Sequence, residues 1–159
     1  MLRRTAFRIT AAALAVSASF LAQAASPTVE ARLKSAGIQY VTDEDGDFKV
    51  TYNYSKEGRT QLVFVSGSTQ EVGSFEVREI FSPAGRVGTD GISNAKAMEL
   101  IENNRKYKLG AWEISGDVLY FVIKLPESLS AKELESAMDI AAETADDMEI
   151  ELSGDRDDL

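Results

Sequence analysis

Asp43-Glu44-Asp45-Gly46-Asp47 is the run of this chain that comes nearest to a metal-binding motif. Asp43, Asp45 and Asp47 stand at the first, third and fifth places, which are ligand positions in an EF-hand calcium loop. Glycine, however, stands at the fourth place instead of the sixth, and Tyr54 stands at the twelfth place, where a glutamate is needed. We therefore predict a solvated turn that feeds a strand, and no metal site.

A second candidate site lies where Gly85, Gly88 and Gly91, with Arg86 among them, precede an expected helix. The start of a helix can bind phosphate, because its free N–H groups point toward the ligand. The glycine spacing matches neither a dinucleotide-binding fingerprint nor a P-loop, and no Lys-Ser or Lys-Thr pair follows. The segment therefore indicates a flexible crossover from sheet to helix, with no bound cofactor.

Side chains suited to catalysis are scarce in this chain. It contains no histidine and no cysteine, which excludes a Ser-His-Asp triad, a thiol nucleophile and the commonest zinc ligands. A carboxylate pair remains as an alternative, but Glu76 and Glu79 are three residues apart on an expected strand and so point to opposite faces. No spacing predicts two acids that converge in one cleft, so we expect no enzyme activity.

Two groups of residues are candidates for contact with a partner. Tyr52, Tyr54, Trp112 and Tyr120 form either an exposed aromatic groove or part of the core beneath the helices. Eleven acidic residues follow from Glu133 onward, and they give the last helix an acidic face that attracts basic partners. The candidate partner-binding residues are Tyr52, Tyr54, Trp112, Tyr120, Glu135, Asp139 and Glu143.

Hydrophobic periodicity and turn residues predict the elements that position these side chains. Helices are expected over about 26–37, 93–104 and 130–148. Strands are expected over 48–55, 62–65, 75–82, 109–114 and 118–125, with a loop over 67–73 and a strand end at Pro83-Ala84-Gly85. The order is therefore α-β-β-β-α-β-β-α.

Helix caps are expected at three positions. Ser26 suits the start of the first helix, and Ser93 suits the start of the second. Ser130 and Glu133 have the spacing of a capping box at the start of the third helix.

Spacing also predicts which residues share a face. Met98 and Ile101 fall on the apolar face of the second helix, whereas Asp146 falls outside the apolar stripe of the third. That stripe consists of Leu134, Met138, Ala141, Ala145 and Met148. On the third strand, Phe75, Val77 and Phe81 share one face and Glu76 and Arg78 the other.

The first 24 residues have the layout of a secretory signal peptide. Three arginines precede an apolar, alanine-rich run over 9–21, and Ala22-Gln23-Ala24 follows as a cleavage site with small residues. The apolar run is too short to stay across a bilayer, which requires about 20 residues. We expect cleavage before Ala25, no stable membrane insertion afterwards, and a periplasmic or secreted protein of the bacterial envelope.

Composition bounds the class of partner. Removal of residues 1–24 leaves about 135 residues, enough for one domain with an apolar core, over 25–152, and an acidic tail over 153–159. The formal charge of the whole chain is −9, and it is more negative without the signal, which holds three arginines and no acid. This charge repels phosphate backbones and anionic lipid, so nucleic acid is not an expected partner.

Several local features resemble the YbjN family. They are the acidic turn after Gly37-Ile38-Gln39-Tyr40, the helix with Asn94 and Asn103-Asn104, the segment Leu109-Gly110-Ala111-Trp112, the hairpin Gly116-Asp117-Val118-Leu119, and Pro126 with Leu129-Ser130 before the last helix. The resemblance spans most of residues 28–152. It implies the α+β fold of the type III secretion chaperones, with one antiparallel sheet and helices packed on it. It also implies binding of extended client segments and pairing into a homodimer, and it supplies no catalytic residues.

The sequence therefore predicts an exported binding or regulatory module without enzyme activity. Its partner is expected to be a protein or peptide, bound through the sheet surface, a free strand edge or the acidic helix face. The first alternative is a small-ligand sensor or carrier, which needs a concave apolar pocket between sheet and helices. The second is a hydrolase that relies on carboxylates alone, which needs two acids buried together.

Overall fold

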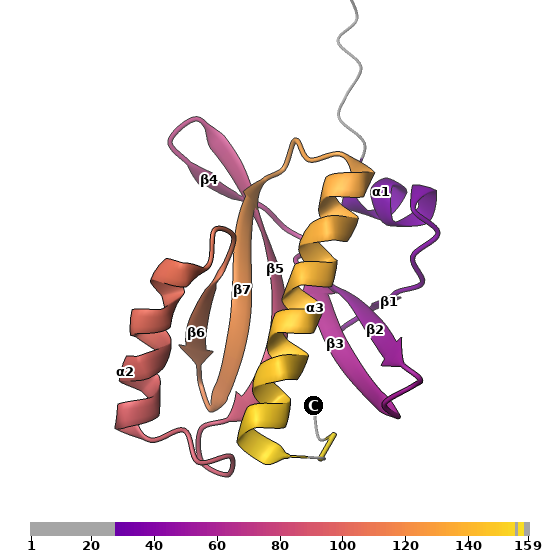
Figure 1. Ribbon diagram of the computed structural model, residues 1–159. Helices are drawn as coiled ribbons and strands as arrows, with labels where there is room; N and C mark the ends of the chain where they lie inside the picture. The colour runs from indigo at the N-terminus through magenta and orange to yellow at the C-terminus, as the bar shows by residue number, and fades with distance from the viewer. Residues whose placement is uncertain (1–27, 155, 158–159) are drawn as a thin grey trace, which may run out of the picture.

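The computed structural model describes residues 28–154, 156 and 157, and it shows an antiparallel sheet with helices packed on it (Figure 1). The strands are β1 (Val41–Thr42), β2 (Phe48–Tyr54), β3 (Arg59–Val65), β4 (Gln70–Val72), β5 (Phe75–Arg86), β6 (Ala111–Ser115) and β7 (Val118–Pro126). The helices are α1 (Val29–Ser35), α2 (Asn94–Asn103) and α3 (Ala131–Ser153), with one 3-10 turn, η1 (Asn104–Lys106). The α+β class and the predicted order are confirmed, with β1 and β4 as additional short strands. The predicted signal peptide lies outside the described residues.

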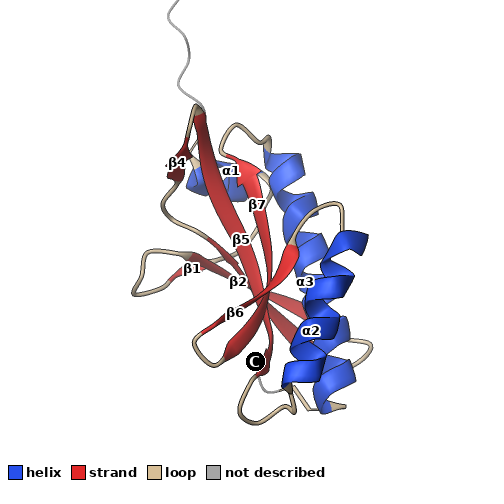
Figure 2. Cartoon of the chain, turned by 90° about the vertical axis from the view of Figure 1, so that its left-hand side faces the viewer, coloured by secondary structure: helices blue, strands red, loops and turns tan. Residues whose placement is uncertain are grey.

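The sheet has the strand order β1-β2-β3-β5-β7-β6, and β4 pairs with β5 beside this path. All strand pairs within the described residues are antiparallel. The predicted hairpin at 115–118 joins β6 to β7, and another joins β2 to β3. Figure 2 shows α2 and α3 on the same side of the sheet. The opposite face is therefore free of these two helices.

Helix α3 contacts β3, β5 and β7, and it supplies much of the core. Its predicted apolar stripe is confirmed, because every residue of that stripe is buried. The stripe packs in one cluster with sheet residues such as Val63, Ile80 and Phe121. The helix continues past the predicted end at Met148 as far as Ser153. None of the described helices is long and apolar enough to span a membrane.

Hydrogen-bonding side chains fix where the helices begin. The capping box of Ser130 and Glu133 is confirmed at the start of α3, and Ser93 is confirmed as the cap of α2. At the start of α1 the cap is Thr28 and not Ser26, because the helix begins at Val29 and the Thr28 hydroxyl accepts from a backbone amide of its first turn. Ser26 itself lies outside the part of the chain that the structure describes.

Two predictions about strands are wrong. The segment 67–73 is not wholly a loop, since it contains β4, which pairs with the start of β5. Strand β5 does not end at Pro83 but continues to Arg86. A register shift between Pro83 and Gly85 accommodates the proline, and in this part β5 pairs with β7 and not with β3. A proline is tolerated there because its missing N–H removes no ladder hydrogen bond.

The apolar face predicted for α2 is largely exposed. Met98 is 57% and Ile101 60% exposed, and Leu100 is the buried residue of this helix. Helix α2 lies beside the edge strand β6 and contacts it over a short stretch, so most of its circumference faces solvent.

Both loops considered as ligand sites use their polar groups internally. The carboxylate of Asp43 accepts hydrogen bonds from the amides of Asp45 (3.0 Å) and Asp47 (2.9 Å), which shapes the predicted turn. In the crossover between β5 and α2, the amide of Gly88 donates to Asp117 Oδ1 at 3.0 Å. The carboxylate of Asp117 thus binds an amide of this glycine-containing loop, and Ser93 accepts from an amide at the start of α2.

Candidate partner-binding surfaces

The face of the sheet that points away from α2 and α3 carries a group of apolar side chains, which we call the open-face patch. Because side chains alternate along a strand, Phe75, Val77 and Phe81 share this face of β5, while Arg78 and Ile80 point toward the core. The register of the neighbouring strands adds the remaining members. The open-face patch consists of Leu62, Phe64, Phe75, Val77, Phe81, Tyr120 and Val122.

Aromatic rings form the centre of the open-face patch. Phe64 pairs with Phe81 across β3 and β5, and Phe81 pairs with Val122 across β5 and β7. The Phe64 and Phe81 rings are stacked, with centroids 5.1 Å apart and an interplanar angle of 7°. Tyr120 meets Phe81 edge-on at 5.8 Å. The three rings are half-buried, and Phe75 is 62% exposed, so this surface is typical of a protein-binding site.

A row of charged residues crosses the open-face patch between Val77 and Phe81, because Glu79 shares their face of β5 and pairs with Lys124 of β7. The Nζ of Lys124 lies 2.7 Å from Glu113 Oε1 and 3.7 Å from Glu79 Oε1. These side chains are nearly half-exposed, so each ion pair contributes at most about 1 kcal/mol. A pocket of about 450 Å³ opens next to them, between Val77 and the segment 66–72. The patch therefore has a concave end that a partner's side chain can enter.

The four aromatic residues singled out from the sequence do not form one groove. Trp112 is buried, and its ring packs against that of Phe121 with centroids 5.1 Å apart. Tyr52 and Tyr54 lie on the same helix-facing side of the sheet. Tyr120 lies on the opposite side, in the open-face patch. Trp112 is thus packed in the core, Tyr52 and Tyr54 are half-buried on the helix-facing side, and Tyr120 is half-buried on the opposite side.

Tyr52 connects the sheet to the acidic face of α3. Its hydroxyl donates to Asp139 Oδ1 at 2.9 Å, and burial together with this hydrogen bond raises the pKa of Tyr52 far above the usual tyrosine value. The Tyr54 hydroxyl, by contrast, is buried and has no hydrogen-bond partner among the described residues. Burial, followed by the charges of Asp146 and Glu143, raises the pKa of Tyr54 to about 12.

A free strand edge lies next to Tyr52. Strand β1 pairs only with the first two residues of β2, so residues 50–54 have no strand partner on that edge within the described chain. A pocket of about 300 Å³ adjoins this edge, with Ile38, Tyr52, Glu135 and Asp139 among its walls. Open main-chain groups beside a pocket suit the addition of a partner strand.

The acidic face of α3 differs from the prediction at its C-terminal half. Glu135, Asp139 and Glu143 are exposed, as the sequence predicts. Asp146 is buried, and Glu149 is only 1% exposed. Both point toward Arg59 at the start of β3.

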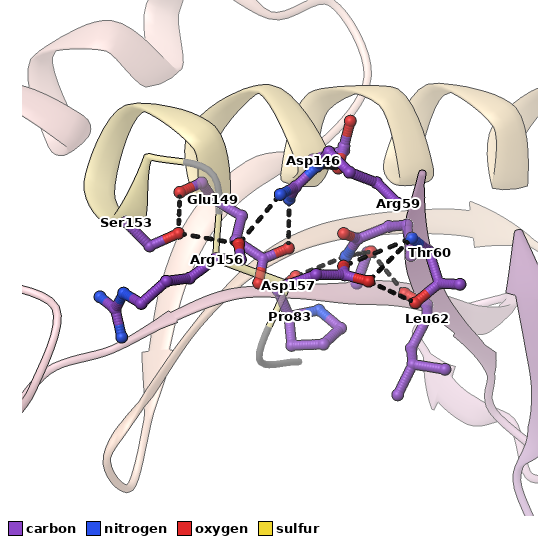
Figure 3. Close-up of polar contacts among 11 residues, drawn as sticks. Arg59, Thr60, Leu62, Pro83, Asp146, Glu149, Ser153, Arg156 and Asp157 are labelled. Atoms are coloured by element: carbon purple, nitrogen blue, oxygen red, sulfur yellow. Dashed lines mark hydrogen bonds and ion pairs between the residues drawn. The ribbon is translucent and has the colours of Figure 1, made fainter. Parts of the chain in front are cut away.

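Arg59 binds the two buried carboxylates with separate nitrogens (Figure 3). Its Nε donates to Asp146 Oδ1 and its Nη2 to Glu149 Oε2, both at 2.9 Å. Burial acts to lower the pKa of Arg59, but the two carboxylates outweigh it and raise the pKa, so the guanidinium stays charged. Removing Arg59 would leave two buried anions, which costs about 3–5 kcal/mol.

This cluster bears on the hydrolase alternative, which requires two acids buried together. Asp146 and Glu149 are buried together, but both bind one guanidinium, as in a structural ion pair. Carboxylate catalysis needs one acid free to protonate a leaving group. The residues described also contain no group of three or more acidic side chains placed to hold a metal ion.

An apolar pocket lies between the end of β7 and the N-terminal half of α3. Its volume is about 320 Å³, and its walls include Leu109, Leu125, Leu129, Ala137 and Ile140. It has the shape and lining that the small-ligand alternative requires.

Comparisons with known proteins bear on the fold. No family model matches the chain, and no curated protein matches it. The structure is similar to one from the HopA1–SchA chaperone–effector complex, with a TM-score of 0.53, 13% identity, and coverage of 74% of this chain and 87% of that one. It is also similar to the Yersinia pestis type III secretion chaperone SycH, solved with a stable fragment of YscM2, with a TM-score of 0.50, 17% identity, and coverage of 78% and 95%. The chain has the fold of these chaperones, and its resemblance to the YbjN family stays a prediction.

Sequence reasoning named the sheet surface and Tyr120, but it missed the other members of the open-face patch and the Arg59 cluster. The signal for the patch was the shared face of Phe75, Val77 and Phe81, but alternation alone does not show which face the helices cover. The signal for the cluster was the spacing of Asp146 and Glu149, three residues apart and so on one side of a helix.

Proposed function

We propose that this chain is an exported, non-enzymatic module of YbjN type that binds a protein partner through the open-face patch. The observation that carries the proposal is the cluster of Phe64, Phe81 and Tyr120 on a sheet face that α2 and α3 leave free. Aromatic side chains are enriched at protein interfaces, where a few residues contribute most of the binding energy. The shared fold supports the proposal, because both similar structures contain a chaperone in complex with another protein.

The free edge of β2 is the second contact in this proposal. An extended segment of the partner adds there as a strand, and its side chains enter the pocket beside Tyr52, Glu135 and Asp139. These acids, with Glu143 farther along α3 and a formal chain charge of −9, favour a segment that carries basic residues. Trp112 and Tyr54 act indirectly, by packing that holds the sheet.

Site-specific photo-crosslinking in the cells that produce the protein tests the open-face patch. Benzoylphenylalanine at Phe75 or Tyr120 samples the patch, and the same photoprobe at Met98 or Ile150 samples exposed positions on α2 and α3. We expect one discrete partner, different in mass from a second copy of this chain, to be crosslinked from Phe75 and Tyr120 and not from Met98 or Ile150. Crosslinks to this partner from the helix positions alone, or equally from all four positions, would contradict the proposal.

Export is the part of the proposal that rests on the predicted signal peptide. We expect the mature protein to begin at Ala25 and to be recovered from the periplasm or the medium. N-terminal sequencing of the protein purified from fractionated cells checks this expectation. A cytoplasmic protein that retains residues 1–24 would refute export and leave the proposed binding surface in place.

We also propose that two copies pair along β6. This strand ends the sheet, and its outer edge has no strand partner within the described residues. Exposed apolar side chains gather on β6 and the neighbouring α2: Ile114 (48%), Met98 (57%) and Ile101 (60%). Light scattering is expected to show a dimer for the wild type and a monomer for Ile101→Glu. A monomer at every wild-type concentration would contradict pairing.

The apolar pocket beside α3 supports a second candidate function, a small-ligand sensor or carrier. Native mass spectrometry of protein purified without denaturation tests it. A discrete added mass that disappears in Ile140→Glu would favour this candidate, since Ile140 lines the pocket. The bare mass of the chain in every preparation would count against it.

A further inference from the structure

Strands β3 and β5 are neighbours in the sheet, but they separate along much of their length. Pairing between them stops at Phe64 and Phe81, which leaves residues 59–63 of β3 and 82–86 of β5 without ladder partners on each other. Pro83 lies in the second of these segments and has no N–H with which to continue the ladder. We call the gap between the two segments the fork.

Side chains bridge the narrow part of the fork. Gln61 Nε2 donates to Ser82 Oγ at 2.8 Å and to the Pro83 carbonyl at 2.6 Å, and Ser82 Oγ donates to the Leu62 carbonyl at 2.6 Å. Gln61 is fully buried, yet its Oε1 has no hydrogen-bond partner among the residues described. A buried acceptor of this kind is uncommon, and it indicates that the polar groups of the fork are not saturated.

The wide end of the fork is occupied by two residues of the chain itself, Arg156 and Asp157 (Figure 3). Arg59 Nη1 donates to the carbonyl oxygen of Arg156 at 2.9 Å. The Asp157 carboxylate accepts from the Thr60 amide at 3.1 and 3.3 Å, and from the Thr60 hydroxyl at 3.0 Å. Asp157 thus takes the Thr60 N–H that a continued ladder would have used.

The side chain of Arg156 meets a buried anion. Its Nη2 lies 3.1 Å from Asp90 Oδ1, and the Asp90 side chain is only 9% exposed. The other carboxylate oxygen of Asp90 accepts from the Arg86 amide at 2.6 Å. That amide, and then the Arg156 guanidinium, lower the pKa of Asp90, so both groups stabilise its charged form and a cation is favoured beside it.

Together these contacts select a cation for Asp90, a main-chain carbonyl for Arg59 and an adjacent carboxylate for Thr60. An extended segment with an arginine followed by an aspartate supplies all three. Arg156 and Asp157 are themselves exposed, so polar contacts hold them, each worth about 0.5–1.5 kcal/mol. An occupant held in this way can be exchanged for another of the same chemistry.

We infer that the fork is a second binding site, which takes an extended protein segment carrying an arginine-aspartate pair, and that Arg156 and Asp157 occupy it in competition with that segment. The fork adjoins the open-face patch at Leu62, but Arg156 and Asp157 contact Arg59, Thr60 and Asp90, none of which belongs to the patch. Because the competing residues follow closely after α3, their effective concentration at the fork is in the millimolar range. In the wild-type chain, Arg156 and Asp157 therefore exclude the partner segment from the fork unless that segment is abundant or has a high affinity.

A peptide-binding measurement on full-length chains tests this inference. The probe is a fluorescent peptide with the sequence of residues 153–159. We expect the variant with Arg156→Ala and Asp157→Ala to bind it at least tenfold more tightly than the wild type. The matched control variant carries Arg105→Ala and Asp45→Ala, which remove the same charges from exposed positions, and it should bind as weakly as the wild type. A peptide with alanine in place of Arg156 and Asp157 should bind none of the three proteins.

The amide NMR signal of Thr60 reports on the fork directly. We expect this signal to shift and its hydrogen exchange to accelerate in the variant with Arg156→Ala and Asp157→Ala, and the peptide to restore both. An unchanged Thr60 signal, equal peptide affinities of wild type and variant, or no binding to either at millimolar peptide would overturn the inference. Adding Tyr120→Ser to the variant with Arg156→Ala and Asp157→Ala should leave its affinity for the peptide unchanged. This result separates the test of the fork from the test of the open-face patch.

Discussion

At the scale of single residues, two ion clusters join the helices to the sheet. Glu127 binds Arg32 of α1 and Arg78 of β5, and both arginines are almost fully buried. Arg59 has the corresponding role for α3 through Asp146 and Glu149. Loss of one member leaves buried charges without a counterion, so the stability of the fold depends on the charge state of these groups.

The stability lost on Glu127→Gln substitution should depend on pH. Burial acts to raise the pKa of Glu127, but the hydrogen bonds and charges of Arg78 and Arg32 outweigh it and lower the pKa. Because the folded-state pKa lies below the unfolded one, the carboxylate stabilises the fold fully above about pH 4.5 and loses this effect as pH falls. We expect the variant to be about 3 kcal/mol less stable than the wild type at pH 7.

Urea denaturation from pH 7 down to pH 2 checks this expectation. The difference in unfolding free energy between wild type and Glu127→Gln should shrink below about pH 4.5, since a protonated carboxyl resembles the amide. A difference that stays constant over the whole range would show that the arginine contacts do not act through the charge of Glu127.

The hydroxyls of Tyr52 and Tyr54 should have opposite effects on stability. Tyr52→Phe removes the hydrogen bond to Asp139 and should cost about 1 kcal/mol. Tyr54→Phe removes a buried hydroxyl that has no partner in the described chain, and it should leave the protein equally stable or more stable. Thermal unfolding of the two variants side by side gives the comparison, and a larger loss for Tyr54→Phe would refute it.

At the scale of elements, close packing between a loop and the sheet explains one glycine. Gly110 precedes β6 with φ = +84°, and an added Cβ would lie 2.6 Å from Cε1 of the fully buried Phe121. Neither the backbone nor the ring can move without disturbing the core around Trp112 and Phe121. The position therefore requires glycine for both conformation and space.

Gly110→Ala should destabilise the protein by about 2–4 kcal/mol, from left-handed backbone strain together with overpacking. Gly58→Ala is the matched control, because Gly58 also has a positive φ (+70°) but no atom within 4 Å of the added Cβ. It should cost about 1 kcal/mol. Chemical denaturation of both variants measures the contribution of packing alone, and equal losses would exclude the contact with Phe121.

Local sequence patterns predicted most helices and strands. The features that they did not predict depend on contacts between residues far apart in the sequence. The apolar stripe of α3 and its capping box are encoded within one segment, so they were predicted correctly. The extension of β5 through Pro83 was not, because it depends on pairing with β7 and on the absence of pairing with β3. The burial of Asp146 depends on Arg59, which lies far away in sequence. Exposure was predicted correctly where it follows local polarity, as for Glu135 and Glu143.

At the scale of the whole molecule, the two sides of the sheet have different roles. The helix-facing side holds the core and the ion clusters, whereas the other side presents the open-face patch. The free edge of β2, the fork between β3 and β5, and the acidic face of α3 add exposed polar groups to this arrangement. Such a division suits a protein that acts by binding, because a rigid core keeps the exposed surface preorganised.

The most direct test of this account is the affinity of the crosslinked partner for two variants with similar exposure at the substituted residue, Phe75→Ser (62%) and Met98→Ser (57%). Titration calorimetry should show binding at least tenfold weaker for Phe75→Ser, and unchanged for Met98→Ser, because Phe75 belongs to the open-face patch and Met98 to α2. Wild-type affinity in Phe75→Ser, with a loss in Met98→Ser, would place the binding surface on the helix side and contradict the account.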